Sequence, residues 1–121
     1  MLSVGVDIIE VARIARAIER WGDRFLKHIY TDAELGYCRG HTPELAVRFA
    51  GKEAISKALG TGLYGISWKE MEILDNRRGR PFVRLYGRAL ARAERLGLRE
   101  WSISLSHSDV HAIAFVVASG Y

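Results

Sequence analysis

Cysteine is scarce in this sequence, and long apolar runs are absent. Cys38 is the only cysteine among 121 residues, which excludes an intrachain disulfide and a zinc site built from several cysteines, and it suits a reducing cytosol. No apolar run approaches the ~20 residues of a membrane span. The first residues, MLSVGVDII, lack the basic segment and the cleavage site of a secretory signal. We therefore expect a cytoplasmic protein that is not embedded in a membrane.

Lysine is also scarce. Of the 18 cationic residues four are lysine and 14 are arginine, and the 14 acidic residues leave a net charge of +4. With 49% hydrophobic and 26% charged residues, the composition is that of a soluble globular protein and excludes a disordered tail. We expect residues 1–121 to form a single domain, given their number. Arginine is favoured over lysine where planar, bidentate contact with phosphate or carboxylate matters.

No repeat, linker or low-complexity segment divides the chain. The apolar and turn patterns predict, in order, a strand over 4–9, a helix over 10–21, a short helix opened by a capping box of Thr31 and Glu34, a helix from Thr42 to about Leu59, strands over 71–74 and 82–86, a helix over 89–96, and strands over 101–105 and 112–118. The last strand is apolar on both faces and should be central. This order favours an α+β fold, an antiparallel or mixed sheet with helices packed on one side.

Asp7 stands in the first apolar strand, where aspartate has a poor propensity. An ionised carboxylate at such a place needs a cation or backbone donors. Two interpretations stay open from its position alone. It caps the following helix from the strand end, or it is a ligand for a hard metal ion such as Mg²⁺, which prefers one or two carboxylates together with substrate phosphate oxygens.

The segment RFAGKEAISKALGTG, residues 48–62, concentrates polar side chains on the predicted long helix. Glu53 and Lys57 are i,i+4 neighbours on that helix. Three further polar residues lie near the same side: Arg48, Lys52 and Ser56. Taken alone, the Glu–Lys pair is ordinary surface decoration, and residues 60–62 fit a helix end and turn as well as a phosphate loop.

The segment SLSHSDVH, residues 104–111, places His107 where a strand passes into a turn. Its neighbours Ser106, Ser108 and Asp109 have the composition of a Ser–His–Asp triad. However, the G-x-S-x-G elbow is absent and neighbours in sequence rarely reach triad geometry. A histidine that donates to a ligand phosphate, or a plain turn histidine, is favoured over the triad.

Three segments carry a family resemblance when taken together. In this order and in a chain this short, VGVDIIEVARI, RFAGKEAISKALGTG and SISLSHSDVHAIAFVV closely resemble the 4′-phosphopantetheinyl transferases, in particular their small bacterial branch, the holo-[acyl-carrier-protein] synthases. The segments TDAELGYC and GRPFVRL also look like this family, so the resemblance spans nearly the whole chain. It implies transfer of the 4′-phosphopantetheine arm of coenzyme A to a serine of an apo acyl carrier protein, with adenosine 3′,5′-bisphosphate as the leaving group.

The resemblance also implies roles for single residues. Asp7 and Glu53 match the family's Mg²⁺ ligands, with Mn²⁺ open as a substitute. Glu53 is our choice of base for the serine, directly or through a metal-bound water, and Lys57 matches the lysine near the reacting phosphates. Contacts with coenzyme A fall, by the same resemblance, on Arg48, Ser56, Lys57, Gly60, Gly62, Pro81 and His107.

An arginine stripe follows the first strand. At 100° per residue it lies apart from the apolar face of the predicted helix, and its members are Arg13, Arg16, Arg20 and, past the helix end, Arg24. Carrier proteins are acidic, so we expect this stripe to dock the carrier, the alternative being an ordinary solvated face. The family branch further implies a homotrimer in which one subunit supplies the metal ligands and its neighbour closes the coenzyme A cleft.

A second basic cluster supports a competing hypothesis. Residues 77–99 hold eight arginines against a single acidic residue, Glu94, as a nucleic-acid-binding module would. No helix-turn-helix signature, RNA-binding aromatic motif or zinc pattern accompanies the cluster. This hypothesis also leaves Asp7 and Glu53 without a role, so the enzyme is preferred.

Overall fold

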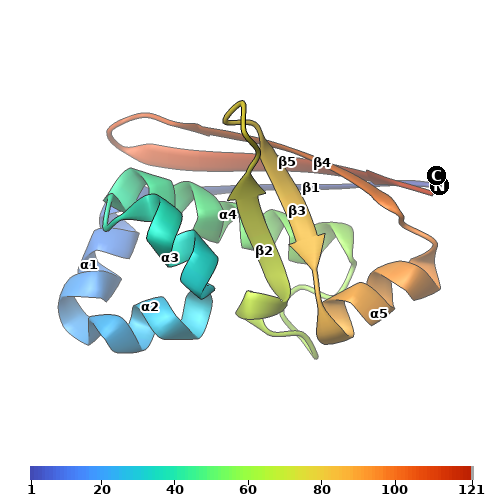
Figure 1. Cartoon of the computed structure of the whole chain (residues 1–121), viewed down its shortest axis with the longest axis horizontal. Helices are drawn as coiled ribbons and strands as arrows, with labels where there is room; N and C mark the ends of the chain where they lie inside the picture. The colour runs from blue at the N-terminus through green and yellow to red at the C-terminus, as the bar shows by residue number, and fades with distance from the viewer. Residues whose placement is uncertain (121) are drawn as a thin grey trace.

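The computed structural model describes residues 1–120 and contains five strands, five α-helices and one short 3-10 helix. In chain order these are β1 (Leu2–Glu10), α1 (Val11–Trp21), α2 (Asp23–Ile29), α3 (Asp32–Cys38), α4 (Thr42–Ala58), η1 (Trp68–Glu70), β2 (Met71–Asp75), β3 (Pro81–Leu85), α5 (Gly87–Leu96), β4 (Glu100–His107) and β5 (His111–Ser119). Helices α1, α2 and α3 gather at one end of the molecule and α5 at the other (Figure 1). Within residues 1–120 no helix combines the length and apolar character that crossing a membrane requires.

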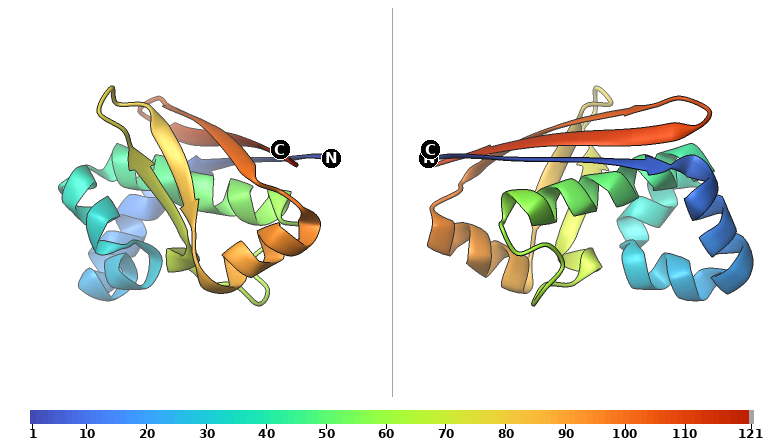
Figure 2. Two further views of the ribbon diagram at one scale, coloured as in Figure 1. Left: turned by 45° about the vertical axis from the view of Figure 1, so that its right-hand side comes forward. Right: turned by 180° about the vertical axis from the view of Figure 1, so that it is seen from behind.

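The strands form two antiparallel sheets. The larger has the order β1-β5-β4, with β5 in the centre as its apolar sequence predicted, and β2 pairs only with β3. The α+β class with antiparallel pairing is therefore confirmed, and the strands are divided between two sheets. Figures 1 and 2 show the reason: the β2–β3 hairpin runs steeply across the three-stranded sheet, so their backbones do not align for pairing.

Helix α2 and the short η1 are the elements that the sequence patterns missed. Gly22, with φ of 55°, ends α1 by donating its N–H to the carbonyl of Ile18, and α2 begins directly after it without a side-chain cap. Seven residues are too few to show a clear helical period. The capping box of Thr31 and Glu34, in contrast, is confirmed at the start of α3.

Helix α4 packs directly on the inner face of the larger sheet. On β1, Gly5 lies so close to α4 that a Cβ there would collide with the carbonyl of Ala54. The helix presents the small buried residues Ala50, Ala54 and Ala58 within this region. Because side chains alternate along a strand, Asp7 projects from the same face of β1 as Gly5 and therefore toward α4.

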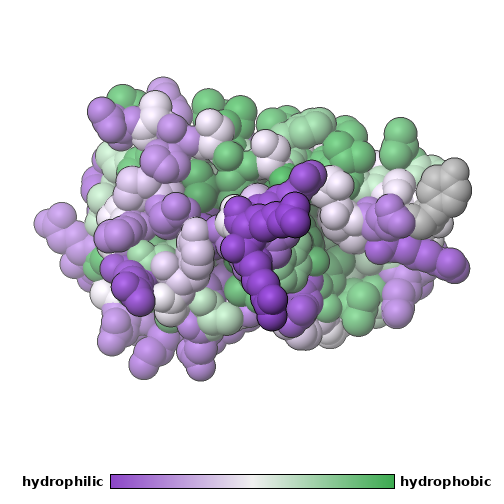
Figure 3. Space-filling model, turned by 45° about the horizontal axis from the view of Figure 1, so that its top comes forward, coloured by the Kyte–Doolittle hydropathy of each residue, from purple (hydrophilic) through white to green (hydrophobic). Residues whose placement is uncertain are grey.

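The outer face of the same sheet is uncovered and apolar. Phe115 on β5 pairs in register with Val6 on β1 and Ser104 on β4, and Phe115 and Val6 are both exposed. The large exposed apolar side chains of this face are Leu2, Val4, Val6, Ile8, Ile113 and Phe115. Figure 3 shows apolar side chains gathered along the upper part of the molecule, where this face lies. A contiguous apolar surface of this kind is typical of an interface.

The close approach of α4 to β1 predicts a cost for any side chain at residue 5. Gly5→Ala should lower the free energy of unfolding by about 1–3 kcal/mol, because a methyl group must be accommodated against helix backbone. Urea denaturation at fixed protein concentration measures this. Gly36→Ala is the matched control, since a Cβ on Gly36 would meet nothing within 4 Å. Equal stability of both variants and the original chain would contradict the packing constraint.

Candidate functional site

Asp7 and Lys57 meet where β1 passes over α4. The Lys57 Nζ donates to Asp7 Oδ1 at 2.9 Å and to the carbonyl of Val6 at 2.9 Å. The Asp7 side chain is only 13% exposed, whereas Lys57 is 52% exposed and reaches in from solvent. The second carboxylate oxygen, Asp7 Oδ2, is buried and has no hydrogen-bond partner among the described residues. Buried polar atoms are nearly always satisfied, so this oxygen is oriented toward a group that the chain itself does not supply.

Glu53 lies one turn before Lys57 on α4 and faces the same region. Partial burial raises the pKa of the Glu53 carboxyl, and the neighbouring Asp7 carboxylate raises it further, while Arg13 and Lys57 act in the opposite direction. Two carboxylates close enough to raise a pKa are destabilised without a cation between them.

Asp7 and Glu53 together form a donor set that fits a hard divalent cation. The orphaned Oδ2 of Asp7 and the raised pKa of Glu53 are the two observations that support this fit. No group of three or more His, Cys, Asp or Glu side chains suited to a metal occurs within residues 1–120. Mg²⁺ needs only one or two carboxylates, because water and substrate phosphates complete its octahedron.

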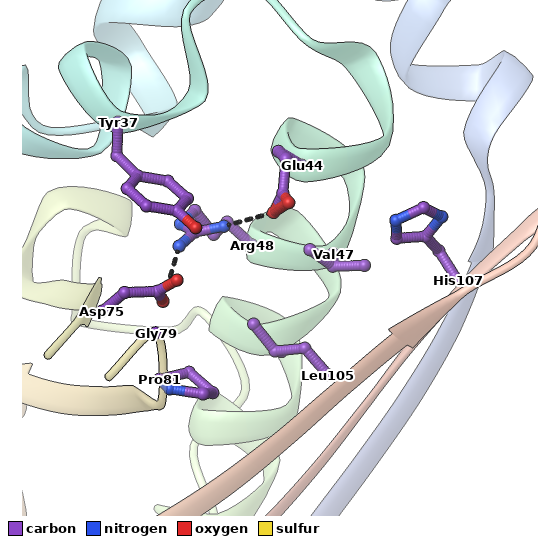
Figure 4. Close-up of a pocket in the computed structure, with 9 residues that line it drawn as sticks. All are labelled: Tyr37, Glu44, Val47, Arg48, Asp75, Gly79, Pro81, Leu105 and His107. Carbon is purple, nitrogen blue, oxygen red and sulfur yellow. Dashed lines mark hydrogen bonds and ion pairs between the residues drawn. The ribbon is translucent and has the colours of Figure 1, made fainter. Parts of the chain in front are cut away.

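A separate cavity of about 270 Å³ lies on the other side of α4. Figure 4 shows its lining, which comes from α3, α4, the β2–β3 hairpin and β4. The lining residues are Tyr37, Glu44, Val47, Arg48, Asp75, Gly79, Pro81, Leu105 and His107. Three residues expected to contact coenzyme A, Arg48, Pro81 and His107, are therefore brought together around one cavity.

Arg48 forms a wall of this cavity. Its side chain is 1% exposed and its Nη1 and Nη2 bind Glu44 and Asp75, each at 3.0 Å. Its Nε donates to the carbonyl of Ile73 at 3.2 Å, and its guanidinium stacks on Tyr37 at 4.5 Å from the ring centroid. The positive charge is thus already neutralised by two carboxylates, and three of the five guanidinium N–H groups are used within the chain.

The remaining residues expected to contact coenzyme A, namely Ser56, Gly60 and Gly62, are held by hydrogen bonds within the chain. The Ser56 hydroxyl is buried and donates to the carbonyl of Glu53 within α4. Gly60 and Gly62 both have positive φ in the turn after α4, and the N–H of Gly62 donates to the carbonyl of Ser56. The N–H of Gly60 likewise donates to the carbonyl of Lys57, so the N–H groups of both glycines are used within the turn.

The histidine segment adopts a turn and contains no triad among its hydrogen bonds. The Ser108 hydroxyl accepts from the N–H groups of Val110 and His111, so it shapes the β4–β5 turn. His107 ends β4 and lines the cavity.

The arginine stripe is exposed, as expected. Arg13, Arg16 and Arg20 are on α1, and Arg24 lies beyond Gly22 on α2. Arg20 stacks on the exposed Trp21, at 5.1 Å from the ring centroid. Arg13 stands over Phe49 and is close enough to Glu53 to lower its pKa, so one end of the stripe borders the carboxylate pair.

The two groups of expected site residues lie at opposite edges of the sheet. Asp7, with Glu53 and Lys57 beside it, belongs to the β1 edge, and none of these three lines the cavity. His107 belongs to the β4 edge, and the β2–β3 hairpin with Pro81 lies next to that edge. Within one chain the two groups of expected site residues therefore lie apart.

A buried ion pair escaped the sequence interpretation. Lys52 Nζ binds Glu34 at 2.8 Å with both side chains fully buried, and it donates to the carbonyls of Trp68 and Met71. Glu34 in turn accepts from the N–H of Ile73. Burial lowers the pKa of Lys52 and the Glu34 carboxylate opposes this shift. The capping box placed Glu34 correctly, but no pattern in the sequence joins it to Lys52.

Comparison with known proteins decides the family. The family model of the 4′-phosphopantetheinyl transferase superfamily matches residues 3–116. The chain belongs to this superfamily.

The relatives within it share one name. The holo-[acyl-carrier-protein] synthases of Herpetosiphon aurantiacus and Dehalococcoides mccartyi strain ATCC BAA-2266 are 50% and 52% identical to this chain; the first alignment covers 99% of this chain and 100% of the relative, and the second covers 98% of each. The crystal structure of the Helicobacter pylori holo-[acyl-carrier-protein] synthase in complex with coenzyme A has a TM-score of 0.88 and 31% identity, over 96% of this chain and 99% of that chain. A Plasmodium yoelii acyl carrier protein synthase with ADP bound has a TM-score of 0.89 and 30% identity, over 98% and 95%.

The raised pKa of Glu53 predicts a pH-dependent gain in stability when its charge is removed. Because its folded pKa exceeds the unfolded value, ionised Glu53 destabilises the fold once the pH rises above that range, and the cost is absent below the unfolded pKa. Glu53→Gln should therefore have a higher Tm than the original chain at pH 7 in metal-free buffer, with the difference vanishing toward pH 4. Glu94→Gln, an exposed change on α5, is the control. A lower Tm for Glu53→Gln at pH 7 would contradict the charge arrangement.

Proposed function

We propose that this protein transfers 4′-phosphopantetheine from coenzyme A to a serine of an apo acyl carrier protein, giving the holo carrier and adenosine 3′,5′-bisphosphate, and that residues 1–121 form one 4′-phosphopantetheinyl transferase domain. The observation that carries the proposal is the orphaned Asp7 Oδ2 beside Glu53 and Lys57. Relatives named for this activity that are about half identical over nearly the whole chain support the same conclusion.

The carboxylate pair would hold Mg²⁺, or Mn²⁺ in its place. When bound, such an ion neutralises charge that develops on the pyrophosphate of coenzyme A. The ligands from this chain would be Asp7, through its unpartnered oxygen, and Glu53.

Glu53 and Lys57 would carry the proton and charge chemistry. The serine oxygen attacks the phosphorus that bears pantetheine, and the bond from that phosphorus to the bridging oxygen of the pyrophosphate breaks. Glu53 takes the serine proton, directly or through a metal-bound water. Lys57, half exposed and bound to Asp7, is placed to turn its ammonium toward the leaving phosphate.

The complete site would form between subunits of a homotrimer. The uncovered apolar face of the larger sheet needs a partner, and the two groups of expected site residues lie at opposite edges of that sheet. A ring of head-to-tail contacts joins one edge of each copy to the other edge of the next. The carboxylates of one subunit would then face the cavity of its neighbour, with Pro81 and His107 around coenzyme A.

The carrier protein would dock on the exposed stripe of Arg13, Arg16, Arg20 and Arg24. Charge complementarity of this type steers an acidic partner and weakens with salt. Because Arg13 borders Glu53, a carrier bound there brings its serine toward the base. We place the activity in the cytoplasm, where the free thiol of Cys38 is stable, in the supply of holo carriers for fatty acid and other lipid biosynthesis.

The nucleic-acid alternative gains no support from the structure. Its eight arginines are distributed over several elements: residues 77, 78 and 80 on the β2–β3 turn, residue 84 on β3, residues 88, 92 and 95 on α5, and residue 99 before β4.

The mass of the carrier protein tests the proposed transfer. An apo carrier incubated with this protein, coenzyme A and Mg²⁺ should gain the mass of one phosphopantetheine. Glu53→Gln should slow the reaction by about 10²–10⁴-fold, the usual loss when a general base is removed. Glu94→Gln should react at the original rate. No mass gain with folded carriers from several sources would contradict the proposed function.

A further inference from the structure

Helix α5 gathers three arginines that the proposed transfer does not use. Arg88, Arg92 and Arg95 follow the i, i+4, i+7 spacing, so they share one face of the helix. With the loop after α4 they line a cavity of about 400 Å³. Figures 1 and 2 show that loop passing beside α5. The cavity has no residue in common with the one around Arg48.

The charge in this cavity is largely uncompensated. No acidic side chain lines it. Glu70, which pairs with Arg88, accepts from the N–H groups of Ser67 and Arg88 at 2.9 and 3.1 Å, and its carboxylate lies 3.8 Å from the Arg88 Nε. Arg95 is exposed and forms no ion pair within residues 1–120. Like charges at i,i+4 destabilise a helix, and a bound anion would remove that repulsion.

One wall of the cavity is fixed in place. Arg92 is half-buried, and its Nε donates to the carbonyl of Leu59 at 3.0 Å. A Cβ on Gly60 would lie 3.5 Å from the Arg92 Nη2, so this guanidinium rests against the start of the glycine loop. A pre-positioned guanidinium loses little side-chain entropy when it binds a phosphate.

An unpacked aromatic ring borders the same cavity. Tyr64 is 88% exposed and lines the cavity with Thr61. Guanidinium groups recognise phosphate through paired N–H donors, and an exposed ring offers a surface for stacking a base.

We propose that the α5 cavity is a second anion site, separate from the catalytic centre, which binds the phosphate groups of a small phosphorylated molecule. Arg92 is its fixed donor, Arg88 and Arg95 close over the ligand, and the glycine loop is in contact with the site through Arg92. Inorganic pyrophosphate and a nucleoside diphosphate share this chemistry. They differ in the base, which only the nucleotide could stack on the ring of Tyr64.

Calorimetric titration of the complete protein tests this site, with pyrophosphate as the probe at constant ionic strength in metal-free buffer. Coenzyme A is left out, because its own diphosphate would compete for the cavity. Lys57→Gln, a change beside the carboxylate pair, should leave this binding unchanged. We expect one pyrophosphate per chain. The double variant Arg88→Gln/Arg95→Gln should weaken binding by at least tenfold, whereas Arg84→Gln/Arg99→Gln removes the same charge outside the cavity and should change it less than twofold. Equal weakening in both pairs, or no binding in the original chain, would overturn the proposal.

Two further measurements separate loss of binding from loss of folding and identify the kind of ligand. If the first double variant has a lower Tm, Arg88→Lys/Arg95→Lys retains the charge and should restore most of the binding; no recovery in a folded lysine variant would also count against the site. Tighter binding of ADP than of pyrophosphate, lost in Tyr64→Ser, identifies a nucleotide, and equal binding identifies the bare phosphate group. Binding is measured without transfer, so its outcome is independent of the proposed function.

Discussion

The contact between α4 and β1 is the constraint on which the rest of the molecule depends. Gly5 lets the strand lie against the carbonyl of Ala54, and this distance brings Asp7 within reach of Lys57. A larger residue at position 5 would push the helix away and separate the carboxylates. The arrangement of the site is therefore a consequence of backbone packing between two adjacent layers. The contacts among its side chains depend on that packing.

Three cations of α4 tie that helix to three different parts of the fold. Arg48 binds Asp75 at the end of β2, Lys52 binds Glu34 on α3, and Lys57 binds Asp7 on β1. Buried ion pairs add little to the free energy of unfolding, but breaking one is costly. Such pairs therefore contribute more to fixing one arrangement of the helix than to its stability. Glu53 is the one charged side chain of α4 outside this set of ion pairs, which include Glu44. The helix is held by three ion pairs to other elements, while the Glu53 carboxylate forms none within residues 1–120.

The sequence predicted the layers better than it predicted the interior of α4. Alternation and capping located the strands and most helices, and the continuous apolar character of residues 112–118 identified the central strand. The separate β2–β3 sheet could not be predicted, because local patterns carry no information on the angle between a hairpin and its neighbours. Periodicity also failed within α4, since 12 of its 17 residues are buried and the helix has no single apolar face. Arg48, Lys52 and Ser56 are consequently buried where polar spacing indicated an accessible surface.

Asp7 and Glu53 could be selected from the sequence. The charge in an apolar strand and the family resemblance both indicated Asp7, and the resemblance indicated Glu53. The structure places the two side by side. The carboxylates and the Arg48 cavity lie at opposite edges of one sheet, which is why we propose that the complete site forms between two subunits.

Subunit mixing tests this division most directly. Glu53→Gln disables the β1 edge, and His107→Glu places a negative charge in the cavity at the β4 edge. Each variant alone should be inactive in transfer. If the proposed homotrimer forms, trimers assembled at random from equal amounts of both variants should recover about a quarter of the original activity. The reason is that one in four head-to-tail contacts pairs two intact edges. Mixed trimers as inactive as either parent would show that each site lies within one chain and would contradict the account.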